Sequence, residues 1–376
     1  MTEKIARFLA ENAPDTPCLV VDIDVICEAY DLLCRYLPIA RVYYAVKANP
    51  APQIVRALGD KGSNFDVASR AEIELCLDNG ATADRLSFGN TIKKERDIAF
   101  AYQAGVRLFA FDSERELEKL ARAAPGAQVF CRILVACDGA EWPLSRKFGC
   151  SPEMAAELLC KARALGLDPY GVSFHVGSQQ TDLSQWDGAI GSAARMFTAL
   201  AEADINLRMV NIGGGFPARY RAAVSPVAEY ARAVNAALTR HFGNDLPAVI
   251  VEPGRSLVGD AGIIQSEVVL IADKGDGGGK RWVYLDVGKF NGLAETMGES
   301  IKYRIATPGR GGPAGPVVIA GPTCDSADIL YEHAEYSLPL DLEVGDKVEI
   351  LAAGAYTASY ASVGFNGFPP LRTYCV

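Results

Sequence analysis

The sequence predicts an α/β protein with two parts, a (β/α)8 TIM-like barrel and a C-terminal all-β domain. Eight short runs rich in β-branched and aromatic residues alternate with amphipathic stretches between about Val42 and Gly259, as in parallel strands joined by helices. The early GxGxxG loop of a dinucleotide-binding sheet is missing, which counts against the alternative of an open doubly wound fold. After about Ala261 the helical period disappears, and short alternating runs follow between turns rich in Gly and Pro.

The chain has 376 residues, and a prior of roughly 150 residues per domain already suggests two domains. We expect the barrel to cover residues 25–261. Residues 1–24 and 262–376 would form the β domain, to which the run CLVVDID before the barrel would add a strand.

The expected elements follow in chain order. The N-terminus, MTEKIARFLAENAPDTP, has the pattern of a short amphipathic helix, and a second helix is expected from about Asp24 to Tyr36. The expected barrel strands are VYYAV from Val42, NFDV from Asn64, RLSF from Arg85, VRLFAF from Val106, QVFCRI from Gln128, YGVSF from Tyr170, RMVNI from Arg208 and AVIV from Ala248. Several helical stretches between them begin at Ser, Asp or Thr and end at Gly, as capped helices do. The β domain would use IIQSEVVLIA, RWVYLDV, GPVVIAG and DKVEILAAG, with a surface hairpin turn at 277–279.

Charge and composition exclude several classes of protein. The 37 basic and 46 acidic residues give a net charge of −9, and an acidic chain without a basic run is a poor nucleic-acid binder. No apolar stretch approaches the roughly 20 residues that cross a bilayer, and the N-terminus lacks the apolar core of a signal peptide. We therefore expect a cytoplasmic protein. The ten cysteines include no CxxC pair and only three histidines are present, so no metal site is expected and most thiols should be small buried side chains.

The barrel prediction places the functional groups at one end of the molecule, because barrel enzymes carry their sites at the carboxyl ends of the strands. The polar groups at those ends are Lys47, Asp66, Arg132, His175, Gly213 to Gly215, Glu252 and Arg255. A lysine, an imidazole, two carboxylates, two guanidinium groups and a glycine loop would thus converge on one mouth.

Each of these groups has a functional interpretation and a simpler one. Lys47 could form a Schiff base, because desolvation lowers the pKa of an amine, or it could extend from the barrel mouth into solvent. His175 could be a general acid, a stacking platform or a buried core histidine, and Ser178 could bind phosphate or cap a helix. Glu252 could bond a protonated ring nitrogen or form a structural ion pair with Arg255.

The glycine loop after the seventh strand offers backbone amides where barrels often hold phosphate. Gly213 to Gly215 would let the main chain approach an anion without a side-chain clash. A lysine, a phosphate site and a carboxylate for a pyridinium together describe the chemistry of pyridoxal 5'-phosphate (PLP).

Eight segments of the chain, in order, resemble the fold-type III decarboxylases, the alanine-racemase-like group that contains ornithine, lysine and diaminopimelate decarboxylases. These segments are YYAVKANP, FDVASRAEIE, KFGCSP, FHVGSQ, NIGGGFP, VEPGR, GPTCDSAD and GAYTASYASVGFNGFPP, spanning residues 43 to 370. The resemblance is strongest to the compact bacterial ornithine decarboxylases. It implies a barrel plus a β domain, PLP as cofactor, and an obligate head-to-tail homodimer with two shared active sites.

The resemblance also implies a role for each matched position. Lys47 would hold PLP as an internal aldimine, Glu252 would bond the pyridine nitrogen and His175 would stack on the ring. The phosphate would be held by Ser178, Gly213, Gly214, Gly215, Arg255 and Tyr356. The surroundings of the aldimine would be organised by Asp66, Glu72 and Arg132. Cys324 and Asp325 would enter from the partner subunit, and Lys147 and Asp328 match positions that form an inter-subunit salt bridge.

The chemistry of these groups favours decarboxylation over racemisation. A carboxylate at Glu252 keeps the ring nitrogen protonated and the electron sink strong, whereas an arginine there would suit racemisation. A thiol such as Cys324 can return a proton to Cα, although the simpler interpretation is a buried packing residue.

Carboxylates near the substrate end favour a distal ammonium group. Asp325 follows Cys324, and the segment GLAETMGES carries Glu295 and Glu299, whereas a diaminopimelate site should offer extra cationic groups. We expect Asp325 and Glu295 to bind the substrate, although Glu295 could equally be a surface charge. Ornithine and lysine differ by one methylene, worth only about 1–3 kcal/mol in a pocket, so both remain candidate substrates.

The alternatives are a diaminopimelate decarboxylase, an amino-acid racemase and a non-catalytic homologue that binds a regulator. The aldimine and phosphate groups that such homologues tend to lose are all present here. The segment from Cys137 to Lys147 has the composition of a lid, and we expect it to be mobile without ligand.

Overall fold

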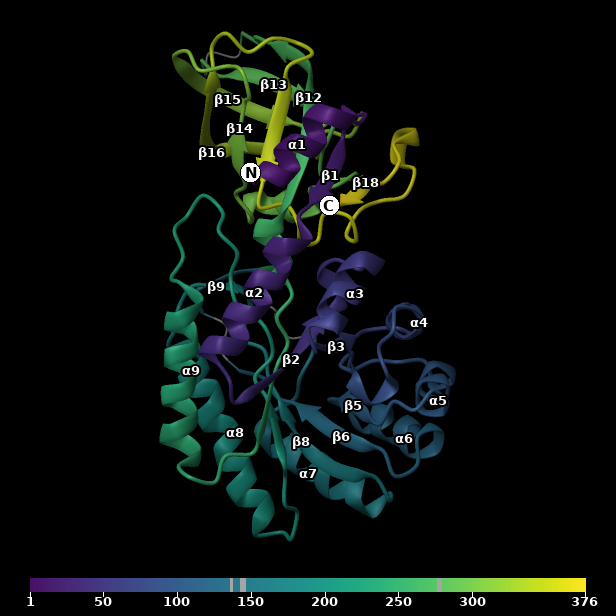
Figure 1. Cartoon of the computed structure of the whole chain (residues 1–376). Coiled ribbons are helices and arrows are strands. Elements are labelled where there is room, and N and C mark those ends of the chain that lie inside the picture. Colours follow the sequence, from purple (N-terminus) through teal and green to yellow (C-terminus); the bar gives the residue numbers. More distant parts are fainter. Residues whose placement is uncertain (136–137, 143–146, 276–278) are drawn as a thin grey trace. The chain divides into compact units, whose positions relative to one another are not determined.

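A computed structural model describes residues 1–135, 138–142, 147–275 and 279–376 (Figure 1). The chain divides into two compact units. The barrel unit comprises Cys27–Pro217 and Ser225–Gly254, and the β unit comprises Met1–Ile26, Ala218–Val224 and Arg255–Val376. The predicted domains differ slightly from these units, because residues 25–26, 218–224 and 255–261 group with the β unit rather than with the barrel.

The barrel unit contains eight parallel strands that close on themselves, as predicted. In spatial order they are β10 (Met209–Asn211), β11 (Ala248–Val251), β2 (Ala40–Ala45), β3 (Asn64–Val67), β4 (Leu86–Phe88), β5 (Leu108–Phe111), β6 (Gln128–Arg132) and β8 (Asp168–Ser173). Each strand corresponds to one of the eight expected runs. Closure of the sheet rules out the open doubly wound alternative.

One helix precedes the first barrel strand, the others connect successive strands, and two of them begin at a serine whose side chain caps the helix. They are α2 (Ile23–Tyr36), α3 (Pro52–Asp60), α4 (Arg70–Asp78), α5 (Glu95–Gln103), α6 (Glu114–Ala123), α7 (Pro152–Ala164), α8 (Gln185–Ala201) and α9 (Val227–Phe242). Ser69 and Ser151 accept hydrogen bonds from backbone amides of α4 and α7, which confirms them as N-terminal caps. Short 3₁₀ turns occur at Val46–Ala48 (η1) and Ala83–Arg85 (η2).

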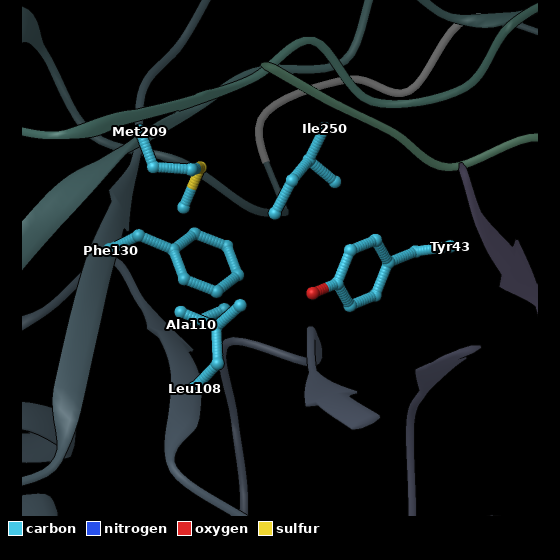
Figure 2. Packing of buried hydrophobic residues seen from close by; sticks show 6 residues of the cluster. All are labelled: Tyr43, Leu108, Ala110, Phe130, Met209 and Ile250. Carbon is cyan, nitrogen blue, oxygen red and sulfur yellow. The ribbon is translucent and has the colours of Figure 1, made fainter. Parts of the chain in front are cut away.

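The interior of the barrel is a packed apolar core. Figure 2 shows side chains from β2, β5, β6, β10 and β11 that converge there, with the Tyr43 ring pointing toward the others. The cluster consists of Tyr43, Leu108, Ala110, Phe130, Met209 and Ile250, all of them buried. Side chains alternate along a strand, so a residue two positions after a core residue lies on the same inner face, nearer the carboxyl end of the barrel.

The β unit is built on one eight-stranded sheet. The order of its main path is β14 (Arg304–Ala306), β17 (Lys347–Leu351), β12 (Gly262–Ala272), β13 (Arg281–Leu285), β15 (Ala314–Ala320) and β16 (Ile329–Pro339). The sequence prediction identified β12, β13, β15 and β17 but omitted β14, β16 and β18 (Arg372–Cys375). In β16 the polar residues of ILYEHAEYSLP interrupt the apolar run, because one face of this strand is exposed.

Both ends of the chain belong to this sheet. Strand β1 (Cys18–Val21) pairs antiparallel with β12 and parallel with β18, which confirms the predicted strand before the barrel. The N-terminal helix α1 (Glu3–Asn12) packs its buried residues Ile5 and Leu9 against this strand pair. Shorter elements of the unit are α10 (Arg255–Val258), η3 (Gly259–Ala261), η4 (Ala294–Glu299) and η5 (Phe365–Gly367).

Two predicted loop features fall partly outside the described residues. Within the expected lid, β7 (Ala140–Trp142) pairs antiparallel with β9 (Ser178–Gln180), but residues 137 and 143–146 are not described. Residues 277 and 278 of the hairpin expected at 277–279 also lie outside the described residues. In the described part of the chain, no helix is both long and apolar enough to span a membrane, and no group of three or more metal-ligating side chains was found.

Candidate active site

Alternation along the barrel strands places polar side chains directly beyond the apolar core. In β6, Phe130 points into the core, and Arg132 continues the same face two residues later. The same step leads from Ile250 to Glu252 at the end of β11. The groups that reach the carboxyl ends of the strands in this way are Asp66, Arg132, Asn211 and Glu252.

Lys47 and Asp66 lie next to each other at this end of the barrel. Lys47 follows β2 in the turn η1, and its side chain is 50% exposed, whereas that of Asp66 is 6% exposed. The Lys47 Nζ lies 3.8 Å from Asp66 Oδ2, and Asp66 Oδ1 is buried without a hydrogen-bond partner among the described residues. Burial raises the pKa of Asp66, although the positive charges of Lys47 and Arg132 oppose the shift. The site thus contains a buried carboxylate with unsatisfied hydrogen-bonding capacity beside a half-exposed amine.

Glu252 is held by a neutral partner. The Asn211 amide donates to Glu252 Oε1 at 2.5 Å, and the Asn211 Oδ1 accepts the backbone N–H of Gly213 at 2.9 Å. Burial is the main cause that raises the pKa of Glu252 to about 7, and the nearby charge of Asp66 adds to it. The structure therefore prepares a carboxyl group whose ionised form a positively charged ligand would stabilise.

The glycine loop after β10 packs tightly against neighbouring backbone. Gly213 and Gly215 have φ values of +68° and +98°, in the region that other residues rarely adopt. A Cβ on Gly214 would lie 2.5 Å from the Glu252 carbonyl oxygen and 3.4 Å from His175 Nε2. The loop must therefore remain glycine, and its position beside His175 and Glu252 is the one that the sequence predicts.

His175 lies close to the positive charges of the site. Its Nδ1 accepts the backbone N–H of Gly177 at 3.0 Å. Burial, followed by the charges of Arg132 and Lys47, holds the pKa of His175 well below its ordinary value. A neutral imidazole suits a stacking role better than a proton-donating one. Ser178 begins β9 rather than a helix, so the interpretation of Ser178 as a helix cap is wrong.

Two further predicted residues have identifiable neighbours. The Arg132 guanidinium lies 5.5 Å from the centre of the Phe148 ring. Ser69, the N-cap of α4, accepts the Glu72 amide, and Glu72 in turn accepts the backbone N–H of Ala68 at 2.6 Å, one residue before the cap. Glu72 thereby orients the helix that follows β3.

In the β unit, Arg255 has a different environment. Its Nη1 and Nη2 donate to the two carboxylate oxygens of Glu295 at 2.7 and 2.5 Å, and Nη1 also donates to the Tyr220 hydroxyl at 2.7 Å. The guanidinium carbon lies 4.8 Å from the centre of the Tyr356 ring. The salt bridge found for Arg255 is thus with Glu295. Glu295 is 5% exposed, so the alternative of a surface charge is wrong.

The second glutamate of the same segment also has its partners within the unit. Glu299 accepts backbone N–H groups of Glu332, His333 and Ala334 at 2.5 to 2.7 Å. These bonds attach η4 to β16. Glu299, like Glu295, therefore already has hydrogen-bond partners inside the β unit, and the expected substrate role of Asp325 and Glu295 stays a prediction.

Cys324 is exposed, so its interpretation as a buried packing residue is wrong. Its backbone N–H donates to Asn366 Oδ1 at 3.1 Å, and Asp325 Oδ1 accepts the Ala327 N–H at 2.8 Å. Asp328 is 3% exposed and accepts the N–H and hydroxyl of Thr323. Among the other described cysteines, Cys18, Cys76, Cys131 and Cys150 are buried and Cys27, Cys34, Cys160 and Cys375 are partly buried, all with free thiols.

Two residues of these clusters escaped the sequence analysis. Asn211 is uncharged, but its place two residues after the core residue Met209 on an inward-facing strand could have identified it. Tyr220 lies in an irregular segment between β10 and α9, and no periodicity connects it with Arg255.

The family model for the pyridoxal-binding domain of pyridoxal-dependent decarboxylases matches residues 24–259. The chain belongs to this family. The lysine/ornithine decarboxylase of Selenomonas ruminantium is 36% identical over 369 residues, which cover 98% of this chain and 91% of the relative. A structure of the lysine decarboxylase from the same organism with PLP and cadaverine has a TM-score of 0.89 and 34% identity, and covers 100% of this chain and 94% of its own. A lysine/ornithine decarboxylase of Vibrio vulnificus with cadaverine has a TM-score of 0.88 and 33% identity, with 99% and 97% covered.

These similarities confirm a fold-type III, PLP-dependent basic amino-acid decarboxylase, and hence a carboxy-lyase. The residues of this decarboxylase fit PLP chemically. A half-exposed lysine suits the aldehyde, and a buried carboxyl with a pKa of about 7 suits the ring nitrogen.

Proposed function

We propose that this decarboxylase converts L-ornithine to putrescine, and L-lysine to cadaverine as a second reaction, in the cytoplasm. The observation that carries the proposal is the grouping of Lys47, Asp66, Asn211 and Glu252 at the carboxyl ends of the barrel strands, where Lys47 lies beside Asp66 and the Asn211 amide donates to Glu252. Relatives that act on both lysine and ornithine support the two substrates.

When bound, PLP supplies the sink for the electrons that remain on Cα after CO2 leaves. Lys47 Nζ is the attachment point for the cofactor aldehyde, and Asp66 at 3.8 Å keeps a counter-charge beside that nitrogen. Glu252 holds a proton on the ring nitrogen. Its raised pKa means that the carboxylate becomes ionised most readily when it gains a positive partner.

The remaining barrel residues orient the cofactor. The uncharged His175 ring would cover one face of the pyridine without adding positive charge. Ser178, the amides of Gly213 to Gly215, Arg255 and Tyr356 would hold the phosphate. Arg132, whose charge lowers the pKa of Asp66, would maintain that carboxylate in its ionised form.

The active form in this proposal is a homodimer that shares two sites. The exposed Cys324 thiol of one subunit would return a proton to Cα in the site of its partner, and Asp325 would bind the distal ammonium of the substrate. Lys147 and Asp328 would form a salt bridge between the subunits. The net charge of −9 would favour the approach of a cationic amino acid.

A substrate panel tests the proposal directly. CO2 release should be measured from L-ornithine, L-lysine and meso-diaminopimelate with the PLP-loaded enzyme. We expect turnover of ornithine, with a kcat/KM for lysine within about 10- to 200-fold of it, because one methylene contributes only about 1–3 kcal/mol. Turnover of diaminopimelate alone would contradict the substrate assignment, and amino-acid racemisation without CO2 release would contradict the reaction.

A further inference from the structure

The Arg255 guanidinium is one of the most constrained charged groups of the β unit. Its side chain is 3% exposed, and that of its partner Glu295 is 6% exposed. The two parallel hydrogen bonds of 2.7 and 2.5 Å form the bidentate arrangement in which both the position and the plane of a guanidinium are determined.

Aromatic side chains complete the surroundings of this arginine. Tyr220 accepts from Nη1, and its ring meets that of Tyr303 edge-on with centres 5.3 Å apart. Tyr356 lies against the guanidinium and has a φ of +59°, an unusual backbone conformation for a side chain of this size. Strain of this kind persists only where the surrounding structure enforces it.

Glu295 is poorly placed to bind a substrate amine. Both of its oxygens already accept from Arg255, and the carboxylate is buried with its charge balanced by the guanidinium. A second cation would have to compete with this bidentate salt bridge. The role of Glu295 must therefore be sought through Arg255.

We propose that Glu295 and Tyr220 are positioning residues that hold the Arg255 guanidinium ready for the phosphate of PLP, and that Glu295 is not a ligand of the substrate. The inference rests on the proposed function, in which Arg255 binds the cofactor phosphate. It replaces the expected substrate role of Glu295 by a role in cofactor affinity.

Two effects of opposite sign act when Glu295 is neutralised. Loss of the carboxylate charge leaves the positive charge of Arg255 without its counter-charge, which alone would strengthen phosphate binding. Loss of the second acceptor oxygen releases the guanidinium plane, because the amide of glutamine presents N–H groups to the N–H groups of arginine. Orientation should dominate, because a guanidinium without its bidentate partner turns toward other acceptors and loses the plane that the salt bridge imposes.

The test compares PLP with pyridoxal, which lacks the phosphate. Both ligands are titrated into the apoenzymes of wild type, Glu295→Gln and Tyr220→Phe, with Glu343→Gln as the matched control. Glu343 is paired with Arg310 in the same unit but its side chain is 74% exposed. We expect Glu295→Gln to raise the Kd for PLP about ten- to a hundredfold, the range for the loss of a charge-assisted hydrogen bond, and to leave the Kd for pyridoxal unchanged. Tyr220→Phe should show the same phosphate-specific loss at smaller size, and Glu343→Gln none.

The KM for ornithine at saturating PLP should remain at its wild-type value in both variants. An increase in this KM with an unchanged Kd for PLP would overturn the proposal and favour a substrate ligand. Equal weakening of PLP and pyridoxal, or tighter binding of PLP by Glu295→Gln, would also overturn it. If Glu295→Gln does not fold, the PLP and pyridoxal titrations of Tyr220→Phe test the proposal instead, because that variant keeps the ring and removes only the hydroxyl. Wild type that fails to bind PLP would instead refute the proposed function.

Discussion

Two buried glutamates, Glu252 in the barrel unit and Glu295 in the β unit, have opposite kinds of hydrogen-bond partner. Glu252 receives one hydrogen bond from the neutral amide of Asn211, and its pKa is raised to about 7. Glu295 receives two charged hydrogen bonds from Arg255 and is 5% exposed. Glu252 thus has a neutral hydrogen-bond partner and is affected by the charges of Lys47 and Arg132 only from a distance, whereas Glu295 forms a direct salt bridge.

The difference shows how a protein separates binding groups from supporting groups. A buried carboxyl without a cation is costly unless a ligand later supplies the positive charge, so such a group indicates where a ligand binds. A buried carboxylate with a bidentate arginine is stable by itself and acts on the ligand through that arginine. The predictions below test this distinction, beginning with the largest expected effect.

Replacement of Lys47 by alanine should abolish turnover, because the lysine is the attachment point for the cofactor. The visible absorbance band of the bound cofactor should disappear with the activity. CO2 release and the absorbance spectrum measure the two effects. Lys61→Ala is the matched control, since Lys61 forms a salt bridge with Asp31 on the barrel unit. Residual turnover and an unchanged band in Lys47→Ala would remove the lysine from the site.

Cys324→Ala should lower kcat by about 10²- to 10⁴-fold, the usual contribution of a positioned general acid. The aldehyde product of a decarboxylation-dependent transamination should increase, since the proton would be delivered to the cofactor instead of to Cα and the amino group would stay on the cofactor. Mixing this variant with Lys47→Ala should restore activity that neither variant has alone, because a mixed dimer contains one intact site. Cys160→Ala serves as the control thiol. Failure of the mixture to regain activity would contradict shared sites.

The raised pKa of Glu252 predicts how the stability of the apoprotein depends on pH. The ordinary pKa of glutamate is 4.5. At pH values between 4.5 and about 7, the folded state therefore holds a proton on Glu252 that the unfolded state has released. The free energy of unfolding contributed by this group is thus fully present below pH 4.5 and is lost as pH rises through about 7, by up to about 3 kcal/mol.

Glu252→Gln should remove this slope relative to wild type, measured by denaturant unfolding at several pH values. Addition of PLP should also flatten the wild-type profile, because a protonated ring nitrogen favours the carboxylate. Parallel profiles for the wild-type and variant apoproteins would show that the pKa of Glu252 is not raised.

Asn211→Ala should produce the smallest of these effects. The variant removes the side-chain hydrogen bond from Asn211 that lowers the pKa of Glu252, so this pKa should rise further. We expect about 1–3 kcal/mol of destabilisation from the unsatisfied carboxyl, together with a shift of the acidic limb of the kcat/KM profile toward higher pH. An acidic limb that stays in place would show that Asn211 does not set the ionisation of Glu252.

Most of the barrel and its mouth could be predicted because both depend on local periodicity. Alternation within strands such as QVFCRI fixes which residues face inward, and the strand ends then identify Arg132 and Glu252. The partners of Arg255 could not be predicted in this way. Glu295 lies 40 residues further along the chain, and its pairing depends on how the β unit folds. Charge alone therefore suggested a substrate ligand, and only the fold shows that Glu295 forms a salt bridge with Arg255.

The most direct single measurement maps the position of the cofactor in the native enzyme. Borohydride reduction of the PLP-loaded protein, followed by proteolysis and mass spectrometry, identifies the lysine that carries the cofactor. We predict that the phosphopyridoxyl group is found on Lys47, whose Nζ lies 3.8 Å from Asp66 Oδ2. Modification of any other lysine, with Lys47 unmodified, would contradict the assignment of the site to the strand-end residues Lys47, Asp66, Asn211 and Glu252.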